Sequence, residues 1–256
     1  MIKAFMPMSG NLGDTLNVMP IISGIYNSTG HKIYLVVRDK MKMFNGFKEF
    51  MEMQPCIAAL KFESEVAVDD DYVRLSLTED FIPHPNRPWE TCRFDKYLKD
   101  NYDFEYEIDD DFILTVPDLE CPTDLYLVGD RTFHRDSDQR RKFNVLKDSE
   151  EFTLNKVYFL DYNLPVATNA AYIKASKKPL LTTFTGISVV SDLLKHNTVV
   201  IYGEDIANWD DKHISYSYNK HFYRDRNCAL IALDEFYIPD DKVMTHEDEW
   251  RDFGTA

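Results

Sequence analysis

The chain has 256 residues, of which 44% are hydrophobic and 29% charged, and its 44 acidic against 29 basic side chains give a formal net charge of −15. This composition predicts a folded globular protein and excludes a disordered chain, and no apolar run approaches the roughly 18 residues of a membrane span. The first residues are not typical of a secretory leader, and the four scattered cysteines form no CxxC pair, so we expect reduced thiols and a cytoplasmic protein. The acidity also disfavours generic binding to nucleic acid or to anionic membranes.

The first sixty residues alternate between strand and helix patterns. Apolar runs predict buried strands at residues 2–6, 32–37 and 56–62. The helical spacing of apolar residues predicts one helix that starts near Asp14 and ends at Gly30, and a second over 43–53. Strand, helix, strand, helix, strand is typical of a parallel, doubly wound α/β sheet.

The same pattern restarts after a less regular middle. A strand at 73–77 and a helix at 89–101 precede an acidic linker at 116–122 that contains two prolines. Beyond the linker, the sequence predicts strands at 125–129, 156–161, 179–184 and 198–202, with helices at 165–174 and 188–196. We therefore expect two α/β domains, residues 1–118 and 119–256.

The negative charge is unevenly distributed along the chain. Residues 1–60, 131–147 and 171–200 carry net charges of +2, +4 and +3, so the remaining residues carry −24. The acidic runs are typical of solvated surface, whereas the three basic stretches would form an anion site if they converge in space. Local basicity of this kind suits a diphosphate and leaves a localised DNA-binding groove open as an alternative.

A glycine-containing turn, Gly10-Asn11-Leu12-Gly13-Asp14, follows the first predicted strand. Such a loop presents backbone N–H groups at a helix start, at the sheet edge where α/β proteins bind ligands. The turn matches neither the GxGxxG dinucleotide motif nor the GxxxxGK[ST] phosphate loop. Asp14 is either an N-cap or a catalytic carboxylate, and loop chemistry alone favours the cap.

The spacing Gly13-Asp14, five residues, then Pro20 resembles the opening of the ADP-heptose:lipopolysaccharide heptosyltransferase family. In that family the aspartate is regarded as the general base that activates the acceptor hydroxyl. The resemblance therefore implies a catalytic role for Asp14, with Gly10, Asn11 and Gly13 in a loop that contacts the donor.

Residues 163–203 follow the order of that family's second half, which is helix, strand, small-residue loop, helix and strand. The family's loop reads roughly D-S-G-P where this chain has Phe184-Thr185-Gly186-Ile187, so the acid and the proline are missing. Free N–H groups and hydroxyls at a helix start favour an anion. The residues that the resemblance implies for the donor diphosphate are Thr183, Thr185, Gly186 and Ser188. The alternative is an ordinary strand-to-helix turn.

A basic loop, residues 129–142, follows the first strand of the second half, where the family has a glycine-led loop that ends in a Lys-Arg-Trp-type segment. Arg140-Arg141-Lys142 takes that place here. One guanidinium group binds two phosphate oxygens at once, and its charge can neutralise a departing diphosphate without a metal. Arg131 and Arg135 are the expected phosphate contacts, and a plain surface role is the alternative.

Together these matches imply a GT-B-like α/β fold, with two Rossmann-like domains and an interdomain cleft. The implied enzyme is an inverting, metal-independent glycosyltransferase that uses a nucleoside-diphosphate sugar as co-substrate and no other cofactor. Its first domain would bind the acceptor and its second the donor. The acceptor is a glycan or, as for similar bacteriophage enzymes, a hydroxymethylated or already glycosylated pyrimidine in DNA, which would place the protein in the host cytoplasm.

Two other functions fit parts of the sequence. A non-catalytic nucleotide or sugar-phosphate binding protein would keep the donor site and lose the base. A GT-A glycosyltransferase would hold Mn²⁺ on Asp136-Ser137-Asp138, a DxD pattern that an acidic chain also produces by chance. The run His246-Glu247-Asp248-Glu249 is more typical of an exposed tail than of a metal site.

Overall fold

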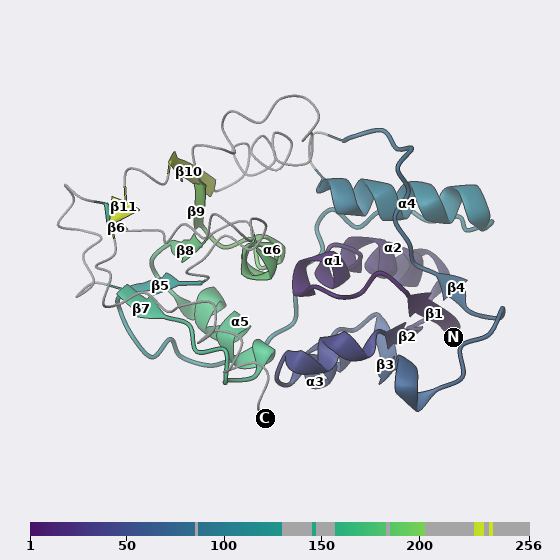
Figure 1. Ribbon diagram of the computed structural model, residues 1–256, viewed down its shortest axis with the longest axis horizontal. Coiled ribbons are helices and arrows are strands. Elements are labelled where there is room, and N and C mark those ends of the chain that lie inside the picture. Colours follow the sequence, from purple (N-terminus) through teal and green to yellow (C-terminus); the bar gives the residue numbers. More distant parts are fainter. Residues whose placement is uncertain are drawn as a thin grey trace. The chain divides into compact units, whose positions relative to one another are not determined.

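The computed structural model describes residues 1–84, 87–129, 157–182 and 185–202, together with the short strand segments 145–146, 228–232 and 236–237. It divides into two compact units, Met1–Asp118 with Tyr162–Ala171 and Leu119–Asp161 with Tyr172–Ala256. Figure 1 shows the elements of each unit. The chain thus crosses between the units more than once, because ten residues from the second half of the sequence belong to the first unit.

The first unit is built on a four-stranded parallel sheet with the order β3-β2-β1-β4. Its strands are β1 (Ile2–Met6), β2 (Ile33–Val37), β3 (Ile57–Phe62) and β4 (Val73–Arg74). The three strands predicted in the first sixty residues are confirmed. The strand expected at 73–77 pairs over two residues only.

The helix expected from Asp14 to Gly30 is two helices, α1 (Leu12–Leu16) and α2 (Met19–Thr29). Pro20 has no N–H to donate to the carbonyl of Leu16, so the helix breaks and restarts with Pro20 in the first turn of α2. Gly30 ends α2 in the left-handed conformation (φ 69°), which confirms the predicted end.

The first unit also contains two further helices and two 3-10 turns. The turns are η1 (Asp39–Met43) after β2 and η2 (Glu63–Glu65) after β3. The helix expected over 43–53 begins later, as α3 (Phe47–Glu52), because Gly46 before it adopts a left-handed conformation. The predicted helix at 89–101 is confirmed as α4 (Trp89–Asn101). Phe47, Phe50 and Phe94 from these helices are fully buried in the core.

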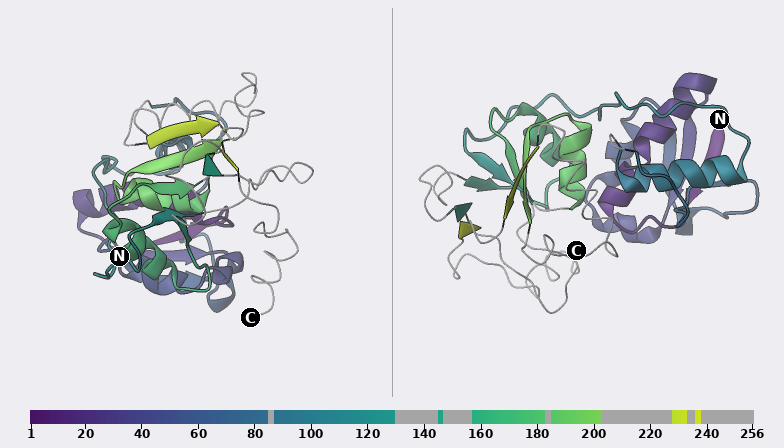
Figure 2. Two further views of the ribbon diagram at one scale, coloured as in Figure 1. Left: turned by 90° about the vertical axis from the view of Figure 1, so that its left-hand side faces the viewer. Right: turned by 90° about the horizontal axis from the view of Figure 1, so that it is seen from above.

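The second unit contains a five-stranded parallel sheet with the order β10-β9-β8-β5-β7. Its strands are β5 (Tyr126–Val128), β7 (Val157–Phe159), β8 (Leu180–Thr182), β9 (Thr198–Tyr202) and β10 (Cys228–Ala232). The helix α6 (Gly186–Leu193) packs against β8 and β9, as Figure 2 shows. The sequence did not predict β10, nor the antiparallel pair of β6 (Val145–Leu146) and β11 (Phe236–Tyr237).

The helix α5 (Val166–Ala175) begins in the first unit and ends in the second. Its start is attached to the first unit by Asn45, whose side-chain Nδ2 donates to the carbonyl of Asn163 (2.6 Å) and whose own carbonyl accepts from the N–H of Val166 (2.8 Å). In the part of the chain that the structure describes, no helix is long and apolar enough to cross a membrane.

Candidate functional site

The candidate site of the first unit lies at the carboxyl ends of β1, β2 and β3, the edge at which parallel α/β sheets bind ligands. The loop of residues 7–11 leaves β1 there and leads into α1. The N-cap of α1 is Asn11, in extended backbone conformation. Asp14 is half-buried and lies in the first turn of α1. The interpretation of Asp14 as a helix N-cap is therefore wrong, because Asn11 occupies that position.

Asn11 and Asp14 are joined through their side chains. Nδ2 of Asn11 donates a hydrogen bond to Oδ2 of Asp14 over 3.1 Å. The backbone of Asn11 is fixed in turn by Thr15, whose N–H and Oγ1 both donate to the Asn11 carbonyl at 3.3 Å. Thr15 is fully buried, with its hydroxyl 3.8 Å from Sδ of the buried Met41. The turn is thus attached to the core through Thr15, the residue that follows Asp14.

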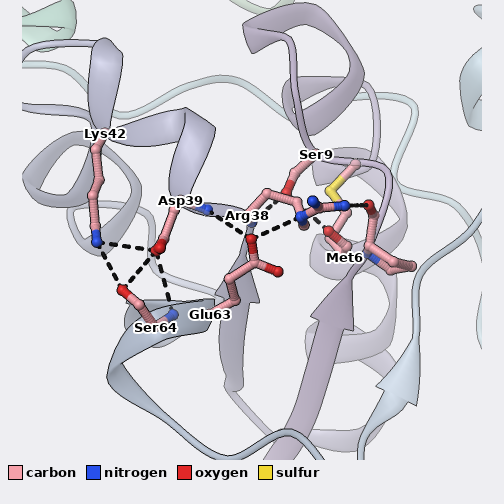
Figure 3. Close-up of polar contacts among 8 residues, drawn as sticks. Met6, Ser9, Arg38, Asp39, Lys42, Glu63 and Ser64 are labelled. Atoms are coloured by element: carbon pink, nitrogen blue, oxygen red, sulfur yellow. Dashed lines mark hydrogen bonds and ion pairs between the residues drawn. The ribbon is translucent and has the colours of Figure 1, made fainter.

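Ser9 and Arg38 hold the loop after β1 against the end of β2 (Figure 3). The buried hydroxyl of Ser9 donates to the carbonyl of Met6 (2.8 Å) and accepts from the N–H of Arg38 (2.7 Å). Nη1 of Arg38 donates to the carbonyl of Pro7 (3.3 Å). Because the Ser9 hydroxyl is buried and joins the ends of β1 and β2, the loop that leads to Asp14 is fixed at its base.

Charged side chains extend this network from β2 to β3. Nε of Arg38 lies 2.8 Å from Oε1 of Glu63, which also accepts from the N–H of Asp39 (3.3 Å). Lys42 donates to Ser64 Oγ (2.8 Å) and pairs with Asp39 Oδ1 (3.0 Å), and the hydroxyl of Ser64 donates to the same oxygen (2.8 Å). The hydrogen bonds from Lys42 and then Ser64 lower the pKa of Asp39. Exposed ion pairs of this kind add little to the free energy of unfolding. They do join the segment after β2 to the segment after β3.

Lys40 differs from its two basic neighbours Arg38 and Lys42. Its side chain lies along Gly10, and a Cβ placed on that glycine would be 3.7 Å from Lys40 Cδ and 3.9 Å from Nζ. Among the described residues Lys40 makes no ion pair, whereas Arg38 and Lys42 both do. The sequence motifs did not single out Lys40, Arg38, Ser9 or Glu63. The positive net charge of residues 1–60 was a signal for Arg38 and Lys40 only.

The predicted donor loop of the second unit precedes α6. Thr185 is the N-cap, in extended conformation, and Gly186 is the first helical residue. Ser188 is almost fully buried, and its Oγ donates to the carbonyl of Thr185 (2.7 Å) and accepts from the Thr185 N–H (3.3 Å). The hydroxyl of Ser188 thus closes the first turn of the helix.

Gly129, at the end of β5, lies against the same region. Its N–H donates to the carbonyl of Leu181 (2.8 Å). A Cβ at this position would lie 2.7 Å from Thr182 Oγ1 and 2.9 Å from Ile187 Cγ2, distances too short for any side chain. The glycine therefore lets the ends of β5 and β8 and the start of α6 meet closely.

The structure brings the predicted residues together in two sets, each within its own unit. Gly10, Asn11, Gly13 and Asp14 share the β1–α1 turn, and Thr185, Gly186 and Ser188 share the start of α6. The remaining predicted residues lie outside the described part of the chain: Arg131, Arg135, Thr183, the Arg140–Lys142 segment, the DxD pattern at 136–138 and the run 246–249.

Comparison with solved structures identifies similar folds. The structure entitled "E. coli heptosyltransferase WaaC with ADP" matches with a TM-score of 0.50 and 11% sequence identity, over 90% of this chain and 93% of that one. A glycosyl transferase family 9 protein from Veillonella parvula DSM 2008 matches with a TM-score of 0.54 and 12% identity, over 96% and 91%.

No family model matches the sequence, and no curated protein sequence does. At identities of 11% and 12% the structural similarity establishes the fold, and it confirms at that level the resemblance to heptosyltransferases that the motifs indicated. The chain has the GT-B-like α/β fold, with a parallel sheet in each of two Rossmann-like units.

Proposed function

We propose that this protein is a glycosyltransferase that moves a sugar from a nucleoside-diphosphate sugar to an acceptor hydroxyl. The observation that carries the proposal is the position of Asp14, a half-buried carboxylate in the first turn after β1, at the carboxyl edge of a parallel sheet. The fold supports it, because similar solved proteins are a heptosyltransferase with ADP and a family 9 glycosyl transferase.

The proposed reaction is a single displacement with inversion. Asp14 accepts the proton of the acceptor hydroxyl as its oxygen attacks the anomeric carbon of the donor sugar. The new C–O bond forms while the bond between that carbon and the diphosphate breaks, and the nucleoside diphosphate leaves with the bonding electrons. The proton remains on Asp14 until it is released to solvent. One suitably placed carboxylate is sufficient for this chemistry.

The charge that develops on the leaving diphosphate needs donors. In our proposal Arg131 and Arg135 supply guanidinium groups, and the turn of Thr183, Thr185 and Gly186 supplies N–H groups and hydroxyls, without a divalent metal. Ser188 contributes by closing the first turn of α6, given its two hydrogen bonds to the backbone of Thr185. Gly10 and Gly13 would allow close approach of substrate to the β1–α1 turn.

The acceptor is proposed as a hydroxyl of a glycan or of a modified pyrimidine in DNA. The two differ in their dependence on salt, because each phosphate that a protein neutralises on duplex DNA adds about 0.9 to the slope of log affinity against log salt. Binding to duplex DNA containing hydroxymethylated pyrimidine, measured between low and physiological salt, separates them. A flat response excludes DNA and favours a glycan.

The experiment that tests the function compares the wild type with Asp14→Asn on a panel of UDP-, GDP-, ADP- and CMP-sugars. Thermal shift identifies the donor, and donor hydrolysis or transfer is then followed with that donor. We expect Asp14→Asn to bind the donor with unchanged affinity and to lose about 10²–10⁴-fold in turnover, the usual contribution of a general base. Glu49→Gln, which removes an exposed carboxylate on α3, is the matched control and should retain full turnover.

Two results would contradict the proposal. Full turnover by Asp14→Asn would remove Asp14 from the mechanism. Tight donor binding by the wild type with neither hydrolysis nor transfer would identify the non-catalytic nucleotide or sugar-phosphate binding protein instead.

A further inference from the structure

The side chain of Asn11 is used in an unusual way for a helix N-cap. Asparagine at this position ordinarily accepts a hydrogen bond from a backbone N–H two or three residues further on, and loss of that bond costs about 1 kcal/mol. The side chain of Asn11 makes no such capping bond. Its amide nitrogen donates to the carboxylate of Asp14 instead (3.1 Å). The side chain of the cap residue is therefore hydrogen-bonded to another side chain and not to the helix backbone.

We propose that Asn11 is a positioning residue that orients the carboxylate of Asp14 for proton transfer. This inference rests on the proposed function, in which Asp14 is the general base. It replaces the sequence-based expectation that Asn11 contacts the donor diphosphate.

The anchoring of Asn11 supports this role. The carbonyl of Asn11 accepts from the N–H and the hydroxyl of Thr15, which is fully buried against Met41. The chain of contacts runs from the buried sulfur of Met41 through Thr15 and Asn11 to the Asp14 carboxylate. The fixed backbone holds the base of the Asn11 side chain in place, and the bond from its amide to the carboxylate restricts the rotation of both side chains.

The chemistry of an amide suits the task. An ionised carboxylate only accepts hydrogen bonds, so the nitrogen of Asn11 and not its oxygen must face Asp14. An amide does not titrate, so the proton taken from an acceptor stays on Asp14 and is not passed to its neighbour. A lysine in the same place would also orient the carboxylate, but its positive charge would favour the ionised carboxylate and make Asp14 a weaker base.

The test uses two variants of Asn11 that separate positioning from helix capping. Asn11→Ser keeps a strong N-cap residue, but its short hydroxyl does not span to the Asp14 carboxylate. Asn11→Asp keeps the shape of the side chain, removes the donor and adds a like charge. Misplacement of a reacting group by about 1 Å costs up to about 100-fold in rate, so we expect kcat to fall about 10-fold in Asn11→Ser and about 100-fold in Asn11→Asp. KM for the nucleotide sugar should stay within about twofold of wild type.

A double variant tests whether Asn11 acts through Asp14. Adding Asn11→Ser to Asp14→Asn should reduce turnover no further, because residues that act as one unit are not additive. An independent second loss would overturn the proposal. So would an unchanged kcat in Asn11→Ser, or a raised donor KM with constant kcat, which would return Asn11 to the role of a diphosphate contact.

A spectroscopic measurement separates this proposal from the proposed function. The side-chain NH₂ signals of Asn11 in a ¹H–¹⁵N spectrum, assigned by their loss in Asn11→Ser, should shift when Asp14 is replaced in Asp14→Ala. Signals that do not move would overturn the positioning role even in a fully active enzyme. Signals that move in a protein that turns over no nucleotide sugar would overturn the proposed function, and with it the role of Asn11 in positioning a catalytic base.

Discussion

The turns that precede α1 and α6 follow the same strand–loop–helix pattern but use their polar side chains differently. Before α6, the hydroxyl of Ser188 makes two hydrogen bonds with the backbone of Thr185 and completes the helix start. Before α1, the side chain of the cap residue Asn11 makes no capping bond to the helix backbone and donates instead to the side chain of Asp14. The first arrangement contributes to stability. The second gives up a capping bond to hold a carboxylate, which is the pattern expected where function and stability compete.

The glycines beside the two turns provide the largest expected difference in stability. Gly129→Ala would place a Cβ 2.7 Å from Thr182 Oγ1 and 2.9 Å from Ile187 Cγ2, and overpacking of this kind costs about 1–3 kcal/mol. A Cβ at Gly10 would make only ordinary van der Waals contacts, with the flexible side chain of Lys40 at 3.7 Å and the Met8 carbonyl oxygen at 3.9 Å, so Gly10→Ala should change the free energy of unfolding by less than about 0.5 kcal/mol. Urea denaturation of both variants measures the difference. Equal stabilities would show that the start of α6 is no more closely packed than the β1–α1 turn.

The two buried serines should have similar effects on stability and different effects on activity. Ser188→Ala and Ser9→Ala each remove a hydroxyl that makes two hydrogen bonds, which costs about 1–2 kcal/mol. Ser9→Ala also releases the loop that leads to Asp14, so its kcat should fall. Ser188→Ala should keep its affinity for the donor within about twofold, because the hydroxyl is hydrogen-bonded to the backbone of the N-cap residue Thr185.

Thermal denaturation and donor titration of both serine variants check this prediction. A large loss of donor affinity in Ser188→Ala, with intact stability, would restore Ser188 as a contact of the diphosphate. A normal kcat in a correctly folded Ser9→Ala protein would show that the base of the loop does not determine the position of Asp14.

Local patterns predicted the elements well where their limits are set by nearby residues. The ranges 89–101 and 198–202 coincide with α4 and β9, and the turn at 10–14 lies at the expected sheet edge. The break between α1 and α2 was missed, although the missing N–H of Pro20 is a local signal for it.

The contact between Arg38 and Glu63 had no signal of this kind. It depends on the register of β2 on β3, in which Val37 pairs with Phe62 and the next residues of both strands lie side by side. Register is a property of the whole sheet, so residues 25 positions apart cannot be paired from local sequence.

Lowering the pH should reduce the stability of the second unit, through His196, in a less acidic range than that of the first unit, through Asp39. Burial lowers the pKa of His196, next to the start of β9, below its ordinary value of 6.5, although a hydrogen bond with the carbonyl of Lys178 opposes the shift in part. Below pH 6.5 the unfolded chain therefore binds this proton before the folded one does, so the free energy of unfolding falls as the pH falls. The pKa of Asp39 is lowered from 3.8, so the stability that it contributes is lost only at more acidic pH.

His196→Gln tests this order by removing the histidine titration. Denaturation midpoints between pH 7.5 and 5 should fall less in this variant than in the wild type. Asp39→Asn should show the same decline as the wild type over that range, at a constant offset, and the offset should disappear only as the pH falls below about 4. If His196→Gln keeps the full decline, another group determines the acid response of the second unit.

The smallest expected effect concerns the ion pair of Arg38 and Glu63. Its side chains are 50% and 33% exposed, and exposed pairs contribute about 0.2–1 kcal/mol. A double-mutant cycle with Arg38→Met and Glu63→Gln should give a coupling energy in that range, and the coupling should decrease at high salt. Arg38→Met should also lower kcat, although it changes the free energy of unfolding little, because the guanidinium holds the carbonyl of Pro7 in the loop that leads to Asp14. A coupling energy well above this range, with unchanged kcat, would mean that the charged edge of the first sheet stabilises the fold and has no part in positioning the loop.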